Sequence, residues 1–260
     1  MVAKLRSLPV VSRTYKDLIR ALEDEECELH TVSEIIERDV GLSTKLLQMV
    51  NSAFFGLPRK VEHVRDAVSL VGLMNVRHLT VTTNVFDALA ADDEAGNLIS
   101  ALWNASIDIG SLSCELARSA GRSREVCEAA RLAGTVSLIG RAVLIRSSFE
   151  RYAGVREVSG AGANRLADAE RAEYGAAQHA VGAYALGLWA FADPVVESVL
   201  GQEAPAESGV SSADHPLAYV HMARSRTRVE GLIDETPLDT AWLASIGIDG
   251  AEMEQLGSAA

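Results

Sequence analysis

The chain has 260 residues, of which 48% are hydrophobic and only 5% aromatic, and its formal net charge is −12. This composition allows a buried core and favours closely packed helices rich in Leu, Val, Ile and Ala. The acidic excess opposes binding to a phosphate backbone, so no nucleic-acid partner is expected. The densest basic cluster, Arg224, Arg226 and Arg228, is interpreted as a solvated helix face.

Three cysteines, Cys27, Cys114 and Cys127, stand far apart and have no Cys-x-x-Cys spacing. Their odd number and apolar neighbours predict reduced, buried thiols in a cytoplasmic protein. No signal peptide and no apolar run of about 18 residues is visible, so no membrane span is predicted. The apolar stretch at residues 181–192 is interpreted as a buried core helix.

Short amphipathic helices are predicted in the first part of the chain. Thr31 and Glu34 have the spacing of a capping box, and Ser43 is predicted to cap the following helix. Asn51 and Gly56 are residue types that end helices. In addition to the two helices that begin near Thr31 and Ser43, periodic apolar positions predict helices over residues 12–22, 62–71 and 75–89.

Longer helices are predicted after the acidic stretch Asp92–Glu94, which we interpret as a boundary between domains. Ser123 is predicted to cap a continuous helix that ends near Arg146, and the Gly-rich segment 153–163 is interpreted as a loop. The other helices predicted in this part of the chain cover residues 97–118, 164–174, 176–190, 194–200 and 216–229. The sequence thus predicts an all-α protein with domains at residues 1–94 and 95–235 and a helical tail at 236–260.

Motifs for common enzyme chemistry are absent from the sequence. There is no P-loop, Rossmann fingerprint, His-Glu-x-x-His, Gly-x-Ser-x-Gly or EF-hand loop. The six histidines include no i, i+4 pair, and the acidic runs Glu23–Glu26 and Asp92–Glu94 are interpreted as solvated. No catalytic residue, metal site or cofactor is therefore predicted.

Residues 5–22 and 35–81 resemble the HDOD family of bacterial signalling domains. The motif that carries the resemblance best is Asn51, Ser52, Ala53, Phe54, Phe55 and Gly56. The resemblance implies a multi-helix HDOD fold, in which an N-terminal helical subdomain packs on a degenerate HD-like helical subdomain. The form of Phe54–Gly56 is similar to HDOD modules that follow a phosphoacceptor receiver domain, which implies an output domain with an upstream receiver domain as a further candidate partner.

The resemblance extends into the second half, where HDOD domains are related to the metal-dependent HD phosphohydrolases. The positions at which the HD phosphohydrolases carry their metal-binding residues are called the HD frame here. At the position of the first histidine this chain has Ala105, and at the His-Asp doublet it has Ser137 and Leu138. Of the metal-binding histidines only His179 remains. These four residues are predicted to line a vestigial pocket. A catalytic metal needs about three protein ligands, so the departures imply that hydrolysis is lost.

The function implied is a non-catalytic output or scaffold module that acts through protein–protein interaction in two-component or cyclic di-GMP signalling. Its partner is expected to be a kinase, diguanylate cyclase or phosphodiesterase. Two alternatives stay open. One is a small-molecule or nucleotide sensor in the vestigial pocket. The other is a residual metal-dependent phosphohydrolase that uses His179, which the first hypothesis interprets as a packed core histidine.

Overall fold

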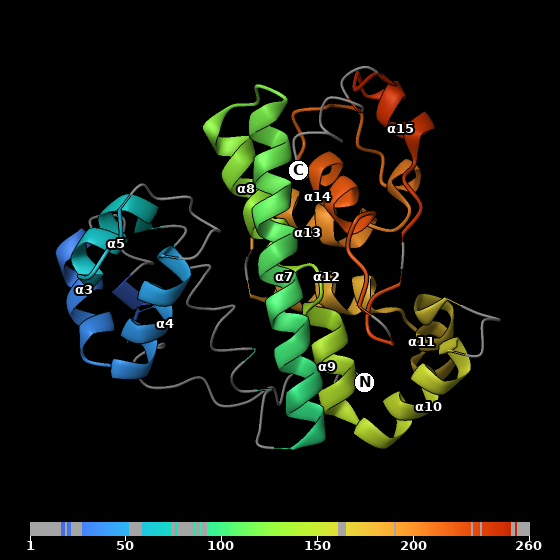
Figure 1. Ribbon diagram of the computed structural model, residues 1–260, viewed down its shortest axis with the longest axis horizontal. Coiled ribbons are helices and arrows are strands. Elements are labelled where there is room, and N and C mark those ends of the chain that lie inside the picture. The colour runs from blue at the N-terminus through green and yellow to red at the C-terminus, as the bar shows by residue number, and fades with distance from the viewer. Residues whose placement is uncertain are drawn as a thin grey trace. The chain divides into compact units, whose positions relative to one another are not determined.

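The computed structural model describes residues 17–18, 20–21, 28–51, 59–73, 76, 86, 89, 93–160, 165–189, 191–229, 231–234, 236–250 and 253. Within these residues every named element is a helix, which confirms the predicted all-α fold (Figure 1). The chain forms two compact units, one at Ser7–Leu89 and one that contains Ala90–Ala260. The sequence prediction placed the first boundary after residue 94.

The smaller unit contains α3 (Leu29–Glu37), α4 (Val40–Val50) and α5 (Val64–Val71), which pack on one another. Apolar residues at helical spacing face its core, because each helix can bury only one side against its neighbours. The α5 helix ends at Gly72, whose φ of +82° suits a residue without a Cβ atom, as predicted. The buried residues of these helices include Val32, Ile36, Leu46, Val50, Val64, Ala67 and Val68.

Both N-terminal caps predicted in this unit, Thr31 and Ser43, are wrong. The α3 helix already begins at Leu29, so Thr31 lies inside it and does not cap it. At the start of α4, the Leu42 N–H donates to Asp39 Oδ1 at 3.0 Å, while the Ser43 hydroxyl donates to the Ile36 carbonyl at 2.9 Å. Asp39 caps because it directly precedes the first helical residue, whereas Ser43 lies one turn inside the helix.

The larger unit begins with α7 (Glu94–Ser119), which runs along this unit with α8, α9 and α14 packed against it (Figure 1). Asp93 caps α7 by accepting the Gly96 N–H at 2.7 Å, and it also accepts a bond from Arg146 Nη1 at 2.7 Å. The end of the acidic stretch therefore starts a helix, and the two units divide earlier, between Leu89 and Ala90.

The predicted continuous helix from Ser123 to Arg146 is in fact two helices. Ser123 caps α8 (Arg124–Val136) as predicted, with Val126 N–H donating to its hydroxyl at 3.4 Å. The chain then turns at Ser137 and Leu138 before α9 (Ile139–Ser147) begins. Almost every residue on both sides of the turn is buried, so packing against other helices decides where the helix breaks.

The loop predicted at residues 153–163 is also wrong in its first part, because α10 (Phe149–Gly160) occupies it. Tyr152 and Val155 are buried, and α10 packs on α11 (Leu166–Tyr174). This burial outweighs the weak helix preference of the glycines.

The α12 helix (Gln178–Leu188) meets α9 through their backbones. A Cβ atom on Gly140 would overlap the Gln178 carbonyl and lie 2.5 Å from Gly182 N, so glycine is required at position 140. The remaining helices of this unit are α13 (Asp193–Gly201), the 3-10 turn η1 (Pro205–Glu207), α14 (Leu217–Arg224) and α15 (Thr240–Ser245).

The described residues include no single helix that is both long and apolar enough to cross a membrane. Residues 124–147, which form α8 and α9, and residues 149–159 of α10 are long and apolar enough only when the two segments are taken together. The chain bends by 119° at the break between these segments.

Candidate functional site

The four residues predicted to line a vestigial pocket all lie in the larger unit. Ala105 is buried in α7, Ser137 and Leu138 form the buried turn between α8 and α9, and His179 is the second residue of α12. The Ser137 carbonyl accepts a hydrogen bond from Gln202 Nε2 at 3.0 Å, which ties this turn to the end of α13. Leu138 is fully buried, so the position for which the resemblance implies a carboxylate in the HD phosphohydrolases holds hydrocarbon here.

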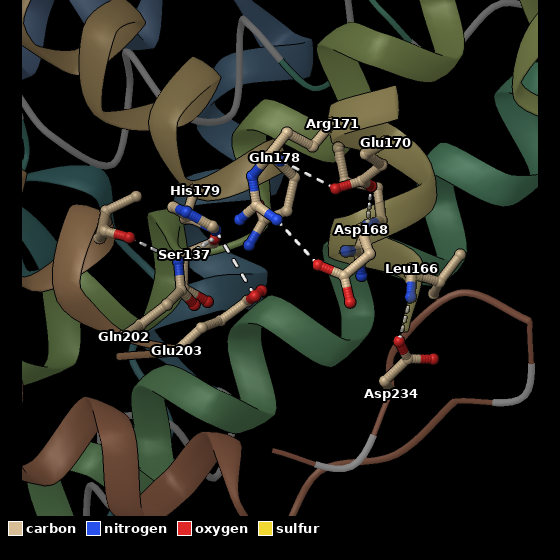
Figure 2. Close-up of polar contacts among 12 residues, drawn as sticks. Ser137, Leu166, Asp168, Glu170, Arg171, Gln178, His179, Gln202, Glu203 and Asp234 are labelled. Carbon is tan, nitrogen blue, oxygen red and sulfur yellow. Dashed lines mark hydrogen bonds and ion pairs between the residues drawn. The ribbon is translucent and has the colours of Figure 1, made fainter. Parts of the chain in front are cut away.

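His179 faces a carboxylate that the sequence analysis did not single out. His179 Nδ1 lies 3.5 Å from Glu203 Oε2, and the two side chains are only 17% and 11% exposed. Figure 2 shows them pointing toward one another, with Gln202 beside Ser137. The separation permits ionic attraction but is too long for a well-formed hydrogen bond. The one signal for Glu203 is its place directly after Gly201 and Gln202, where the HD frame would have later ligands.

Glu203 is ionised at neutral pH. Burial alone raises the pKa of its carboxyl group, but the contact with His179 and the charges of Arg141 and Arg224 outweigh burial and lower the pKa to about 2. This part of the unit therefore holds a negative charge, which faces the cationic side chains of Arg141 from α9 and Arg224 from α14.

A buried ion pair lies next to this site. Arg141 Nε donates to Glu170 Oε1 at 2.7 Å, and Arg141 Nη1 donates to the Leu232 carbonyl at 2.6 Å. Glu170 also accepts the Tyr152 hydroxyl at 2.8 Å and the Gln178 N–H at 2.8 Å. Although burial favours loss of the proton, the charge of Glu170 raises the pKa of Arg141 above its usual value. Both charges are well satisfied, so this pair connects four helices and does no evident chemistry.

Arg224, at the end of α14, is buried as well, so its interpretation as part of a solvated face is wrong. Its side chain is 1% exposed, whereas Arg226 and Arg228 are exposed. Its Nε and Nη1 atoms have no hydrogen-bond partner among the described residues. Burial lowers the pKa of Arg224 to about 10, against the opposing charge of Glu203. A cluster of arginines in a sequence does not show which member the helix turns inward.

Other buried polar atoms near His179 and Glu203 also lack partners among the residues that the structure describes. Both polar atoms of the Gln178 side chain, Ser137 Oγ and Gln202 Oε1 are in this position. Buried polar groups are normally hydrogen-bonded, because leaving one unpaired costs about 1–3 kcal/mol. Several unpaired groups in one place indicate a site that takes solvent or a ligand.

His221 connects this region to the C-terminal segment. Its Nε2 accepts the Asp239 N–H at 2.9 Å, so the ring proton of the neutral form lies on Nδ1 and is donated to the Gln202 carbonyl at 2.9 Å. Trp242 meets the ring edge to face with 6.1 Å between centroids. Burial lowers the pKa of His221, which keeps the ring neutral.

Only one residue of the predicted family motif is described. Asn51 ends α4, and its Nδ2 donates to the carbonyls of Leu47 and Val61 at 2.8 and 2.6 Å. Its Oδ1 accepts the Val61 N–H at 2.6 Å. Asn51 therefore joins the end of α4 to the chain before α5. Ser52, Ala53, Phe54, Phe55 and Gly56 lie outside the described residues.

The described residues contain no group of three or more His, Cys, Asp or Glu side chains placed to hold a metal ion. Cys114 and Cys127 are free and buried, as predicted, while Cys27 is not among the described residues. Burial raises the pKa of both described thiols, so they stay protonated at neutral pH.

Comparison with known proteins gives a family match over most of the chain. The model of the HDOD domain matches residues 8–205. A protein of Treponema pallidum (strain Nichols) is 25% identical over 202 residues, which are 75% of this chain and 37% of that protein. The uncharacterized protein YuxH of Bacillus subtilis (strain 168) is 33% identical over 64 residues, 25% of this chain and 16% of its own. The chain thus spans well under half the length of these relatives.

Solved structures share the fold. An HDOD domain protein of unknown function from Geobacter sulfurreducens has a TM-score of 0.70 at 19% identity, over 96% of this chain and 88% of that chain. A protein from Shewanella amazonensis SB2B, provisionally described as a phosphohydrolase, has a TM-score of 0.67 at 22% identity, over 99% and 93%. One from Marinobacter aquaeolei VT8, provisionally described as a signal transduction protein, has a TM-score of 0.68 at 20% identity, over 97% and 57%.

Proposed function

Because the chain belongs to the HDOD domain family, we propose that it is a non-catalytic signal-transduction output module that acts by binding another signalling protein. The observation that carries the proposal is the set of side chains at the HD-like positions. Ala105 and Leu138 supply hydrocarbon and Ser137 a hydroxyl, so His179 is left as the one imidazole of the predicted ligand set. A single imidazole binds a divalent ion weakly compared with three or four protein ligands.

The wider setting proposed is two-component or cyclic di-GMP signalling, with a kinase, diguanylate cyclase or phosphodiesterase as the partner. The description of the Marinobacter relative as a signal transduction protein supports this class of function. In a longer protein, a receiver domain before this chain would bias the population of its binding-competent state.

The test is a binding assay with purified candidates from these three classes, measured by interferometry with and without a metal chelator. The proposal expects saturable binding to one partner that the chelator leaves unchanged. Binding to none of the candidates, by the chain alone or by the chain fused to a receiver domain, would contradict it.

Two exposed apolar residues offer a way to map that contact. Tyr184 and Leu188 lie one turn apart on α12 and are 42% and 54% exposed. A Leu188→Asp variant leaves the core intact, so weaker binding would place the partner on α12. Val158→Asp, at a residue of α10 that is 51% exposed, is the matched control.

The competing assignment is a residual phosphohydrolase. Elemental analysis of the purified chain for Mn, Fe and Zn, together with assays on cyclic dinucleotides and nucleotides, distinguishes the two. We expect no turnover. A stoichiometric metal that is lost together with activity in His179→Ala would replace the non-catalytic proposal.

A further inference from the structure

Arg224 is placed toward the His179–Glu203 site by the helix that carries it. Arg224 follows His221 by three residues on α14, so the two side chains lie on the same side of the helix. His221 Nδ1 contacts the Gln202 carbonyl at 2.9 Å. The buried guanidinium of Arg224 is thereby directed to the end of α13, where Glu203 follows Gln202.

Arg141 and Arg224, each only 1% exposed, have different surroundings. Arg141 has a carboxylate oxygen at 2.7 Å, whereas Arg224 has no carboxylate within ion-pair distance among the described residues. Asp234 exerts an attractive charge on Arg224 but already accepts the Leu166 N–H at 2.5 Å. A buried guanidinium whose Nε and Nη1 donors are unmet is unfavourable, so an acceptor from outside the described residues would be favoured.

Polar side chains without partners in the described part of the chain gather at the end of α13, the region toward which Arg224 is directed. Ser137 Oγ and Gln202 Oε1 are fully buried and lack partners among the described residues. His179 and Glu203 are part of the same group but reach solvent with 17% and 11% of their side chains. They are therefore the members of this group that solvent reaches, while Arg224, on which the charge of Glu203 acts, is fully buried.

We propose that Arg224 holds a small oxyanion, such as a phosphate or carboxylate group, in this internal site, and that the anion enters beside His179 and Glu203. An arginine supplies several N–H donors and a charge that persists at every physiological pH, which suits it to such oxygens. Glu203 opposes the anion, so the site takes a small or singly charged group more readily than a highly charged one. The site is independent of the protein-binding function proposed above.

The test uses the full chain in a thermal-shift assay and in calorimetric titration with inorganic phosphate and with acetate, at constant ionic strength set by chloride. We expect saturable stabilisation by at least one of these anions beyond that of chloride. The two arms separate a phosphate site from a carboxylate site. Arg224→Gln should abolish binding, while Arg228→Gln, which changes an exposed arginine of the same cluster, should leave it unchanged.

A second variant keeps the test decisive if Arg224→Gln does not fold. Glu203→Gln removes one negative charge beside the anion, and affinity should rise by at least about threefold. Unchanged affinity in Glu203→Gln would overturn the proposal. Anion binding by a folded Arg224→Gln variant that equals wild-type binding would also overturn the proposal, as would no effect of either anion beyond that of chloride. Either result would mean that water alone hydrogen-bonds to Arg224.

Discussion

Arg141 and Glu170 form an ion pair with 2.7 Å between Nε and Oε1, and both side chains are almost completely buried. Glu170→Gln would leave the Arg141 charge in the core without compensation. Removing one partner of a buried pair costs about 3–5 kcal/mol, so a loss of this size in the free energy of unfolding is expected in urea denaturation.

The same helix provides the control for that experiment. Asp168 pairs with Arg171 at 2.8 Å, but both side chains are 54% exposed, so solvent screens the attraction. Asp168→Asn should change stability by less than about 0.5 kcal/mol. Similar effects of the two substitutions would mean that the Arg141–Glu170 pair does not hold α9 and α11 together.

Because α9 and α12 are in backbone contact, adding one methyl group at Gly140 should strongly destabilise the folded chain. In Gly140→Ala the new Cβ atom would overlap the Gln178 carbonyl, and backbone cannot rotate away as a side chain can. We expect a loss of about 3 kcal/mol or more, measured by thermal and urea unfolding.

Gly154→Ala is the matched substitution, because a Cβ atom there would meet nothing within 4 Å and the residue lies inside α10. Alanine has the better helix propensity, so the chain should gain about 0.5–1 kcal/mol. A Gly140→Ala variant as stable as the wild type would show that α9 and α12 are not in backbone contact.

His221 predicts a dependence of stability on pH. Burial lowers its folded pKa below 6.5. The hydrogen bond to the Gln202 carbonyl and the charge of Asp239 oppose this effect, and the charge of Arg224 adds to it. Between the lowered value and 6.5 the unfolded chain binds more protons than the folded chain. The free energy of unfolding should therefore fall as pH is lowered from 6.5 through this window, and this contribution should be constant above it.

His221→Gln keeps an acceptor for the Asp239 N–H but does not titrate. The variant should be less stable at pH 7.5, and its stability should change less between pH 7.5 and 5.5 than that of the wild type. His30→Gln, at an exposed histidine paired with Glu34, is the control. An unaltered pH slope in His221→Gln would show that protonation of this ring is not linked to unfolding.

The side chain of Asn51 is expected to stabilise the smaller unit where α4 ends. Asn51→Ala removes the side-chain bonds to Leu47 and Val61, including the acceptor for the Val61 N–H. We expect a loss of about 1–3 kcal/mol and faster hydrogen exchange at the Val61 amide. Thr44→Ala, which removes one exposed bond to the Val40 carbonyl, should leave that amide protected. Unchanged exchange in Asn51→Ala would contradict the role assigned to this side chain.

Features with a local cause could be predicted from the sequence. Ser123 caps α8, and Gly72 ends α5, because cap oxygens and positive φ angles depend on neighbouring residues. The all-α fold follows from apolar spacing for the same reason. The family resemblance added the HD frame, within which His179 could be singled out.

Features decided by contacts across the fold could not be predicted. The break at Ser137 and Leu138 and the helix at residues 149–160 depend on burial against other helices. Glu203 lies near enough to Arg224 for their charges to interact because α13 packs on α14, and neither the sequence around Glu203 nor the arginine cluster indicates a buried charge.

The close approach of Gly140 to Gly182 limits how this unit can respond to a partner. With no side chains between the two backbones, neither helix can slide or rotate past the other without a steric clash. Helices α9 and α12 must therefore move as one rigid block. A conformational change in the larger unit therefore has to alter the contacts around these two helices. Examples are the hydrogen bonds of His221 with the Gln202 carbonyl and the Asp239 N–H.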